Sequence, residues 1–132
     1  MPDTVSSISR AGFATENHIG EHTITVDSRE ERGPNPTATL LASYASCFVV
    51  GLRIAASEEG FDDLGTVQID VTGTRDDSND LDGVAFDLAI EHYPGDEAAD
   101  EVVDRALRTC HVGTALREEL EADVTVHPKG ED

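Results

Sequence analysis

The chain contains no tryptophan, a single lysine and only two cysteines among its 132 residues. Two cysteines are too few for a secreted domain held together by disulfides. The first ten residues contain no apolar segment of the kind found in secretory leaders, so we expect a cytoplasmic protein. The longest apolar stretch, Leu40 to Ala56, is interrupted by Ser43, Ser46 and Arg53. It is short for a membrane span and predicts a buried helix, with no membrane as partner.

Positive charge is also scarce, since 28 acidic residues face 9 basic ones and give a formal net charge of −19. Such a field repels nucleic acid and anionic membrane surfaces, which excludes both as expected partners. The acidic residues are spread along the chain rather than gathered in one tail. This pattern is typical of halophilic proteins, whose self-repulsion is screened by salt. An ordinary soluble acidic protein is the alternative interpretation.

The chain shows neither repeats nor a low-complexity linker, which predicts one domain over residues 1–132. Residues 4–27 predict short strands, the clearest of them at 23–26. In the following run Gly33-Pro34-Asn35-Pro36, Asn35 suits a helix N-cap and Pro36 the first helical position. A helix is therefore expected from Pro36 to about Ser57. It is apolar nearly all round, which predicts burial on most sides.

The second half of the chain alternates between apolar and polar residues in two stretches, 67–72 and 84–90. This period predicts antiparallel strands with one buried face, joined by a hairpin loop at 76–83. An apolar stripe at helical spacing predicts a second helix over 96–109, with Cys110 at its end. A short third helix over 113–120 and a last strand over 123–127 complete the expected order. The fold class is α+β, with an antiparallel sheet wrapped around a buried central helix.

The two cysteines are the candidate reactive residues. Cys47 lies in the middle of the predicted central helix, and Ser43 and Gly51, four residues to either side, share its stripe. These small side chains would leave an apolar groove beside the thiol, or they serve close helix packing. Cys110 lies on the core side of the second helix. The pair is therefore a candidate redox couple, and two unrelated buried thiols are an equal alternative.

A reactive Cys47 must be a thiolate. Apolar surroundings raise the pKa of a thiol above its usual value of ~8.5, and Cys47 is too far from the helix start to benefit from the helix dipole. We therefore expect a cation from elsewhere in the fold, with Arg10, Arg29 and Arg32 as candidates. Arg53 lies about 240° round the helix from Cys47 and should face away.

The helix start and the cysteines resemble the OsmC/Ohr family. The resemblance rests on Asn35-Pro36, followed by the run Leu40-Leu41-Ala42-Ser43-Tyr44-Ala45-Ser46-Cys47-Phe48. In that family an Asn-Pro pair opens the central helix and a reactive cysteine follows eleven residues after the proline, as Cys47 does here. Tyr44 and Phe48 resemble the Ohr branch, and Cys110 lies where the family has its second cysteine.

The resemblance implies an intertwined homodimer that reduces organic hydroperoxides, and to some degree hydrogen peroxide, with a thiol or dithiol as reductant. Cys47 would become a sulfenic acid and Cys110 would condense with it to a disulfide. Arg10 best matches the catalytic arginine, and no metal or organic cofactor is implied. The substrate pocket would be formed by Ser43, Tyr44, Phe48 and Gly51.

The chain departs from the family pattern at three places. Thr37 occupies the position after the proline, where the family's peroxidases usually have a glutamate that holds the arginine, and Glu30 or Glu31 would have to replace it. His111 and Gly113 occupy positions that are usually proline and serine. His111 either tunes Cys110 or is a solvated helix-end residue. The N-terminal region that should supply Arg10 is short and matches loosely.

Other functions have less support in the sequence. The five histidines form no metal-binding motif, and no Cys-x-x-Cys occurs, so no metal is expected. A serine hydrolase is disfavoured because no Gly-x-Ser-x-Gly elbow exists. The main alternative is a non-catalytic OsmC-like protein that binds an apolar ligand or senses oxidants through its thiols, and Thr37 favours it.

Overall fold

The computed structural model describes residues 3–130, and residues 1–2 and 131–132 lie outside the described part. Contacts divide the chain into two compact units, Met1–Leu41 and Ala42–Asp132. This division does not test whether residues 1–132 form a single domain, and that expectation stays a prediction. The described part contains both helices and strands, and this confirms the α+β class.

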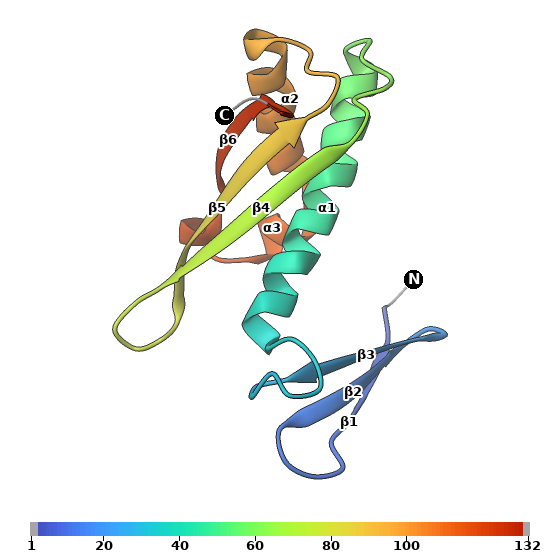
Figure 1. The fold of residues 1–132 in the computed structure, drawn as a ribbon, viewed down its shortest axis with the longest axis vertical. Helices are drawn as coiled ribbons and strands as arrows, with labels where there is room; N and C mark the ends of the chain where they lie inside the picture. The colour runs from blue at the N-terminus through green and yellow to red at the C-terminus, as the bar shows by residue number, and fades with distance from the viewer. Residues whose placement is uncertain (1–2, 131–132) are drawn as a thin grey trace. The chain divides into compact units, whose positions relative to one another are not determined.

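The first unit is an antiparallel meander of three strands, β1 (Val5–Ile8), β2 (Ala14–Ile19) and β3 (His22–Asp27) (Figure 1). The loop after β3 is organised by Asp27, which is 3% exposed. Its carboxylate accepts hydrogen bonds from the backbone N–H groups of Arg29, at 2.9 Å, and Arg32, at 3.1 Å. A side chain at Gly33 would collide with the Thr25 carbonyl, so the loop returns past β3 only with glycine there.

Helix α1 (Pro36–Glu58) begins where the sequence predicts. The Asn35 side chain accepts a hydrogen bond from the Ala38 N–H at 2.8 Å, which confirms the N-cap. Pro36 then occupies the first helical position, where a missing N–H costs nothing. The Asn-Pro pair therefore fixes the start of the helix that carries Cys47.

Only one face of α1 is buried, so the expectation of burial on most sides is wrong for a single chain. The buried side chains are Tyr44, Phe48, Leu52, Ala55 and Ala56. On another face Val50 and Ile54 are 56% and 57% exposed. By length and composition alone α1 could cross a membrane, but its buried face belongs to the core of the second unit. Apolar composition predicts that a helix face is shielded from water. It does not show whether the same chain or another one shields it.

The second unit contains a sheet of β4 (Val67–Arg75), β5 (Leu81–Ile90) and β6 (Asp123–Pro128), in that order. Val84, Phe86, Leu88 and Ile90 are buried on one face of β5, as the alternation predicts. β4 and β5 are antiparallel, but β6 runs parallel to β5, so the expectation of a purely antiparallel sheet is wrong here. The chain returns to the sheet through helices, and such a crossover allows a parallel neighbour.

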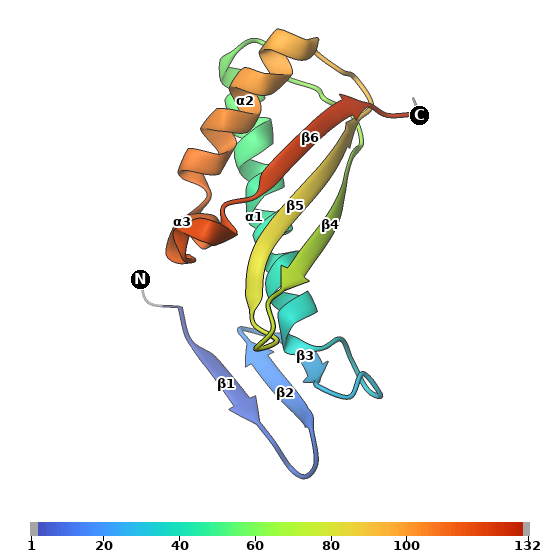
Figure 2. The same cartoon turned by 90° about the vertical axis from the view of Figure 1, so that its left-hand side faces the viewer.

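Helix α2 (Asp96–Thr109) has the predicted bounds. The single helix expected over 113–120 is instead two short pieces, α3 (His111–Ala115) and a 3-10 turn, Glu118–Leu120. The break comes at Leu116, whose backbone is extended. α1 and α2 lie on the same face of the sheet (Figure 2). There Phe86 of β5 meets the rings of Tyr44 and Phe48 edge-on, with centroids 4.9 and 5.1 Å apart.

Candidate functional site

The second unit brings Cys47 and Cys110 together. Cys47 lies in the middle of α1, and Cys110 is the extended residue between α2 and α3. The two helices approach closely at Gly51, where an added Cβ would lie 3.7 Å from Ala106. The two thiols are free and within hydrogen-bonding reach of each other. Cys110 is 1% exposed, whereas Cys47 is partly open to solvent.

The surroundings of Cys47 favour its thiolate. The pKa of Cys47 is lowered chiefly by a hydrogen bond from the backbone N–H of Val112, with further contributions from the Cys110 thiol and the His111 N–H. Burial acts in the opposite direction and is outweighed. From the sequence we expected an arginine to stabilise the Cys47 thiolate. The structure instead places backbone amides of α3 beside Cys47, a contact that no sequence pattern reveals.

The surroundings of Cys110 favour its protonated thiol. Burial raises the pKa of Cys110, and negative charge on Cys47 raises it further. The Gly113 N–H, which donates to the Cys110 sulfur at 3.4 Å, offsets part of this rise. The surroundings of the pair therefore favour the thiolate form at Cys47 and the protonated form at Cys110. This is the arrangement that a nucleophile and a second, later-acting thiol require.

The lowered pKa of Cys47 predicts how its alkylation depends on pH. Only the thiolate reacts with iodoacetamide, so the rate is highest above the pKa and falls as pH falls through it. We expect a midpoint below that of an unperturbed thiol, because the amide hydrogen bonds lower the pKa of Cys47. The measurement is the rate of carbamidomethylation at Cys47 by mass spectrometry. In Cys47→Ser the remaining thiol is buried Cys110, which should react slowly. A midpoint at or above the usual value would show that the amides do not stabilise the thiolate.

A groove runs beside Cys47 between α1 and α2, with a volume of about 550 Å³. Its lining consists of Cys47, Val50, Gly51, Ile54, Ala55, Glu58, Arg105, Thr109 and His111. Gly51 is therefore both a lining residue and the place where the helices approach. His111 is exposed and lines the groove, so it lies near Cys47 as well as next to Cys110.

The other three residues expected at the pocket lie elsewhere in the structure. Phe48 is fully buried in the core, and Ser43 is exposed on α1. Tyr44 is 1% exposed, and burial raises its pKa. Its hydroxyl accepts a hydrogen bond from the Ala122 N–H at 2.9 Å. Tyr44 also lines a different cavity, of about 510 Å³, together with Gly113. The sequence missed Val50, whose position on the groove depends on where α2 packs.

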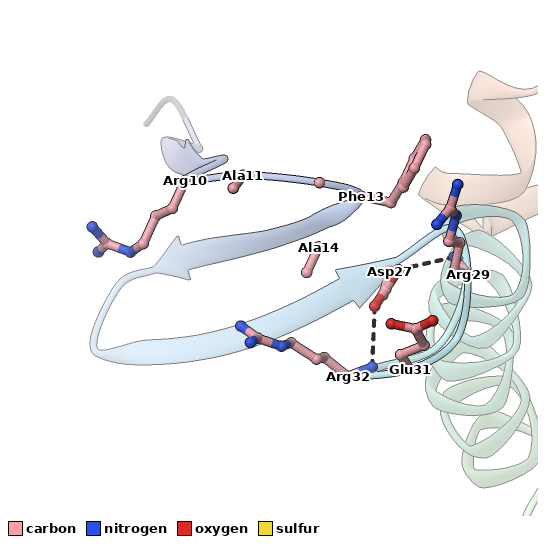
Figure 3. A pocket seen from close by; sticks show the side chains of 9 residues that line it. Arg10, Ala11, Phe13, Ala14, Asp27, Arg29, Glu31 and Arg32 are labelled. Carbon is pink, nitrogen blue, oxygen red and sulfur yellow. Dashed lines mark hydrogen bonds between the residues drawn. The ribbon is translucent and has the colours of Figure 1, made fainter.

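The candidate arginines lie in the first unit, around a cavity of about 310 Å³ (Figure 3). Arg29 stands over the Phe13 ring, 4.1 Å from its centroid. Arg10 pairs with Glu16 at 2.8 Å, and this contact raises the pKa of Arg10 and lowers that of Glu16. Glu30, one of the two carboxylates expected to hold Arg10, instead accepts a hydrogen bond from Asn35 at 3.2 Å.

Two further expectations concern single residues and metals. Arg53 donates to the Gly65 carbonyl at 2.8 Å, within the second unit. This contact directs its guanidinium to the loop before β4. Within residues 3–130, the structure places no group of three or more His, Cys, Asp or Glu side chains so that it could hold a metal ion.

Comparisons with known proteins identify a family and a shared fold. A family model described as OsmC-like protein matches residues 28–125. An uncharacterized protein of Haloferax volcanii is 46% identical over 121 residues, which cover 92% of each chain. A solved OsmC-like protein from Mycoplasma pneumoniae has a TM-score of 0.86 at 17% identity, covering 97% of both chains. The organic hydroperoxide resistance protein OhrB of Bacillus subtilis has a TM-score of 0.70 at 22% identity, covering 94% of this chain and 98% of that one. These structures share the fold.

Proposed function

Because this chain belongs to the family of OsmC-like proteins, we propose that it is a thiol-dependent peroxidase that reduces organic hydroperoxides. The observation that carries the proposal is the pair of adjacent thiols with opposite pKa shifts, lowered at Cys47 and raised at Cys110. A structural relative is named as an organic hydroperoxide resistance protein, which supports the same substrate class. Arg10 is the arginine we assign to the reaction, and this assignment rests on the resemblance alone.

In the first step the Cys47 thiolate attacks the terminal oxygen of a hydroperoxide. An S–O bond forms, the O–O bond breaks, and the alkoxide that leaves takes a proton from solvent to become an alcohol. Cys47 is oxidised by two electrons to a sulfenic acid, and the peroxide is reduced by two. The amides of His111 and Val112 stabilise the thiolate before this step.

In the second step the Cys110 sulfur attacks the sulfenic acid sulfur of Cys47, and an S–S bond forms as the S–O bond breaks. The displaced hydroxide takes the proton of the Cys110 thiol and leaves as water. Oxidation of Cys47 removes the negative charge that contributes to the raised pKa of Cys110. The first step therefore makes the second thiol easier to ionise. An external dithiol then reduces the disulfide by exchange and is itself oxidised. The cycle requires no metal or organic cofactor.

Turnover by the unmodified protein tests the proposal. The protein is mixed with an excess of cumene hydroperoxide and dithiothreitol, and both are followed over time. A peroxidase consumes many equivalents of peroxide, with one dithiol oxidised for each. Thr37 favours two other functions, and they give other results. A thiol sensor consumes one equivalent of peroxide and stays oxidised, and an apolar-ligand binder consumes none. Either of these two results with dithiol present would refute the peroxidase.

We further propose that the protein is a cytoplasmic homodimer whose subunits meet through the exposed apolar face of α1. Each chain carries a net charge of −19, so association should strengthen with salt as the screening length falls from ~10 Å at 0.1 M to ~3 Å at 1 M. Light scattering should show more dimer at 1 M KCl.

Val50→Asp, which places a carboxylate on that face, should shift the mass toward the monomer. Thr72→Asp is the control, because it adds the same charge on an exposed position of β4. A monomer at every salt concentration would contradict the dimer.

A further inference from the structure

His111, the first residue of α3, is held beside Cys47 through its backbone. Its N–H donates to the Cys47 sulfur, and its carbonyl accepts a hydrogen bond from the Thr114 hydroxyl at 3.3 Å. The residue is exposed, and within residues 3–130 its ring makes neither a hydrogen bond nor an ion pair. The backbone thus fixes His111 at the reactive sulfur, while the imidazole is available to a molecule that Cys47 attacks.

The first step of the proposed cycle needs a proton where the alkoxide leaves. An alkoxide is a strong base, so the O–O bond breaks faster when an acid protonates the leaving oxygen as it departs. The Cys110 thiol is not suited to this task, because it is 1% exposed and its proton is used in the second step. The donor should therefore be a side chain that faces the groove beside Cys47.

Four side chains that line this groove carry an exchangeable proton or could carry one, apart from Cys47 itself: Glu58, Arg105, Thr109 and His111. Glu58 lies roughly 16 Å further along α1, at ~1.5 Å per residue, and it accepts a hydrogen bond from Arg105 at 2.6 Å. An arginine side chain is not deprotonated in proteins. The Thr109 hydroxyl already donates to the Arg105 carbonyl at 3.0 Å. His111 remains, and imidazole both gives and takes a proton near neutral pH.

We infer that His111 is the general acid of the first step and delivers a solvent proton to the leaving oxygen. As the Cys47 sulfur bonds to the terminal oxygen, the electron pair of the O–O bond moves to the other oxygen. The protonated imidazole passes its proton to that oxygen, which leaves as the alcohol, and the imidazole regains a proton from solvent. This inference rests on the proposed peroxidase function and adds a catalytic residue to it.

Peroxides with different leaving groups test the inference. tert-Butyl hydroperoxide releases a strongly basic alkoxide, whereas peracetic acid releases acetate, which needs no proton to leave. Reduced protein is mixed with each peroxide in the absence of dithiol, and the rate of Cys47 oxidation is measured by quenched-flow alkylation and mass spectrometry. General acids contribute roughly 10²–10⁴-fold, and water replaces part of this contribution. In His111→Gln we therefore expect the rate with tert-butyl hydroperoxide to fall at least tenfold, and the rate with peracetic acid to stay within twofold.

Two controls separate the imidazole from the structure around it. Glutamine keeps the backbone N–H at position 111, so His111→Gln should leave the midpoint of Cys47 alkylation unchanged. His92→Gln makes the same exchange at an exposed histidine near Asp63, outside the groove lining, and should change neither rate. In His111→Ala, added imidazole should restore part of the rate with tert-butyl hydroperoxide.

Each possible failure has a different signature. If the unmodified protein consumes no peroxide faster than Cys47→Ser does, the peroxidase itself is refuted. If the peroxidase is active and His111→Gln keeps both rates, His111 is a solvated helix-end residue and the inference is overturned. If both rates fall together, His111 acts on Cys47 and not on the leaving oxygen, which also overturns it.

Discussion

Cys47→Ser is expected to lower peroxide turnover by at least about a thousandfold, to the rate of the uncatalysed reaction with dithiol. A serine hydroxyl remains protonated at neutral pH, so the two amides and the Cys110 thiol have no anion to stabilise. The substitution exchanges sulfur for oxygen at a partly exposed position of α1, and the fold should persist. Consumption of cumene hydroperoxide with dithiothreitol measures the loss, and circular dichroism verifies the fold.

Cys110→Ser is the matched control, because it makes the same exchange at the neighbouring thiol. This variant should still reduce one equivalent of peroxide rapidly, since Cys47 keeps both amide hydrogen bonds. It should then accumulate a sulfenic acid at Cys47, which dimedone traps and mass spectrometry detects. Subsequent turnover should be slow, because the external dithiol must attack the sulfenic acid directly. Equal rates for Cys47→Ser and the unmodified protein would refute the assignment of the nucleophile.

The sequence predicted those parts of the fold that depend on local pattern. Asn35 and Pro36 located the start of α1 because an N-cap and a first-turn proline are local requirements. The period of two along β5 and the apolar stripe of α2 identified elements whose buried faces the structure confirms. Each of these signals lies within one element, and a sequence displays it completely.

The sequence could not predict features that depend on how elements meet. The parallel direction of β6 follows from the crossover through α2 and α3, which leaves no local trace. Cys47 lay on a predicted helix, but the groups that lower its pKa are backbone amides of His111 and Val112. Every residue except proline carries such an amide. These two lower the pKa of Cys47 only because α3 places them beside its sulfur. For the same reason the sequence directed attention to arginines as the source of positive potential.

Gly113→Ala is expected to destabilise the protein and to raise the pKa of Cys47 at the same time. A Cβ at Gly113 would lie 2.8 Å from Cε1 of the Tyr44 ring and 3.2 Å from its hydroxyl oxygen. That ring cannot move aside easily, because it is packed against Phe86 and its hydroxyl accepts the Ala122 N–H. Relief must therefore come from a shift of α3. We expect a loss of about 1–3 kcal/mol in the free energy of unfolding, as for other overpacked sites.

The shift of α3 carries the functional consequence, since α3 supplies the His111 and Val112 amides that hold the Cys47 thiolate. Moving them away should raise the midpoint of Cys47 alkylation toward the usual thiol value, with less thiolate at neutral pH. Gly51→Ala is the matched control, because it makes the same substitution on α1, the helix that carries Cys47. Its added Cβ would come no closer than 3.5 Å to Thr109, an ordinary contact, and alanine favours the helix. Gly51→Ala should therefore keep the alkylation midpoint and the stability. If Gly113→Ala leaves the midpoint unchanged despite a measurable loss of stability, α3 is not what sets the reactivity of Cys47.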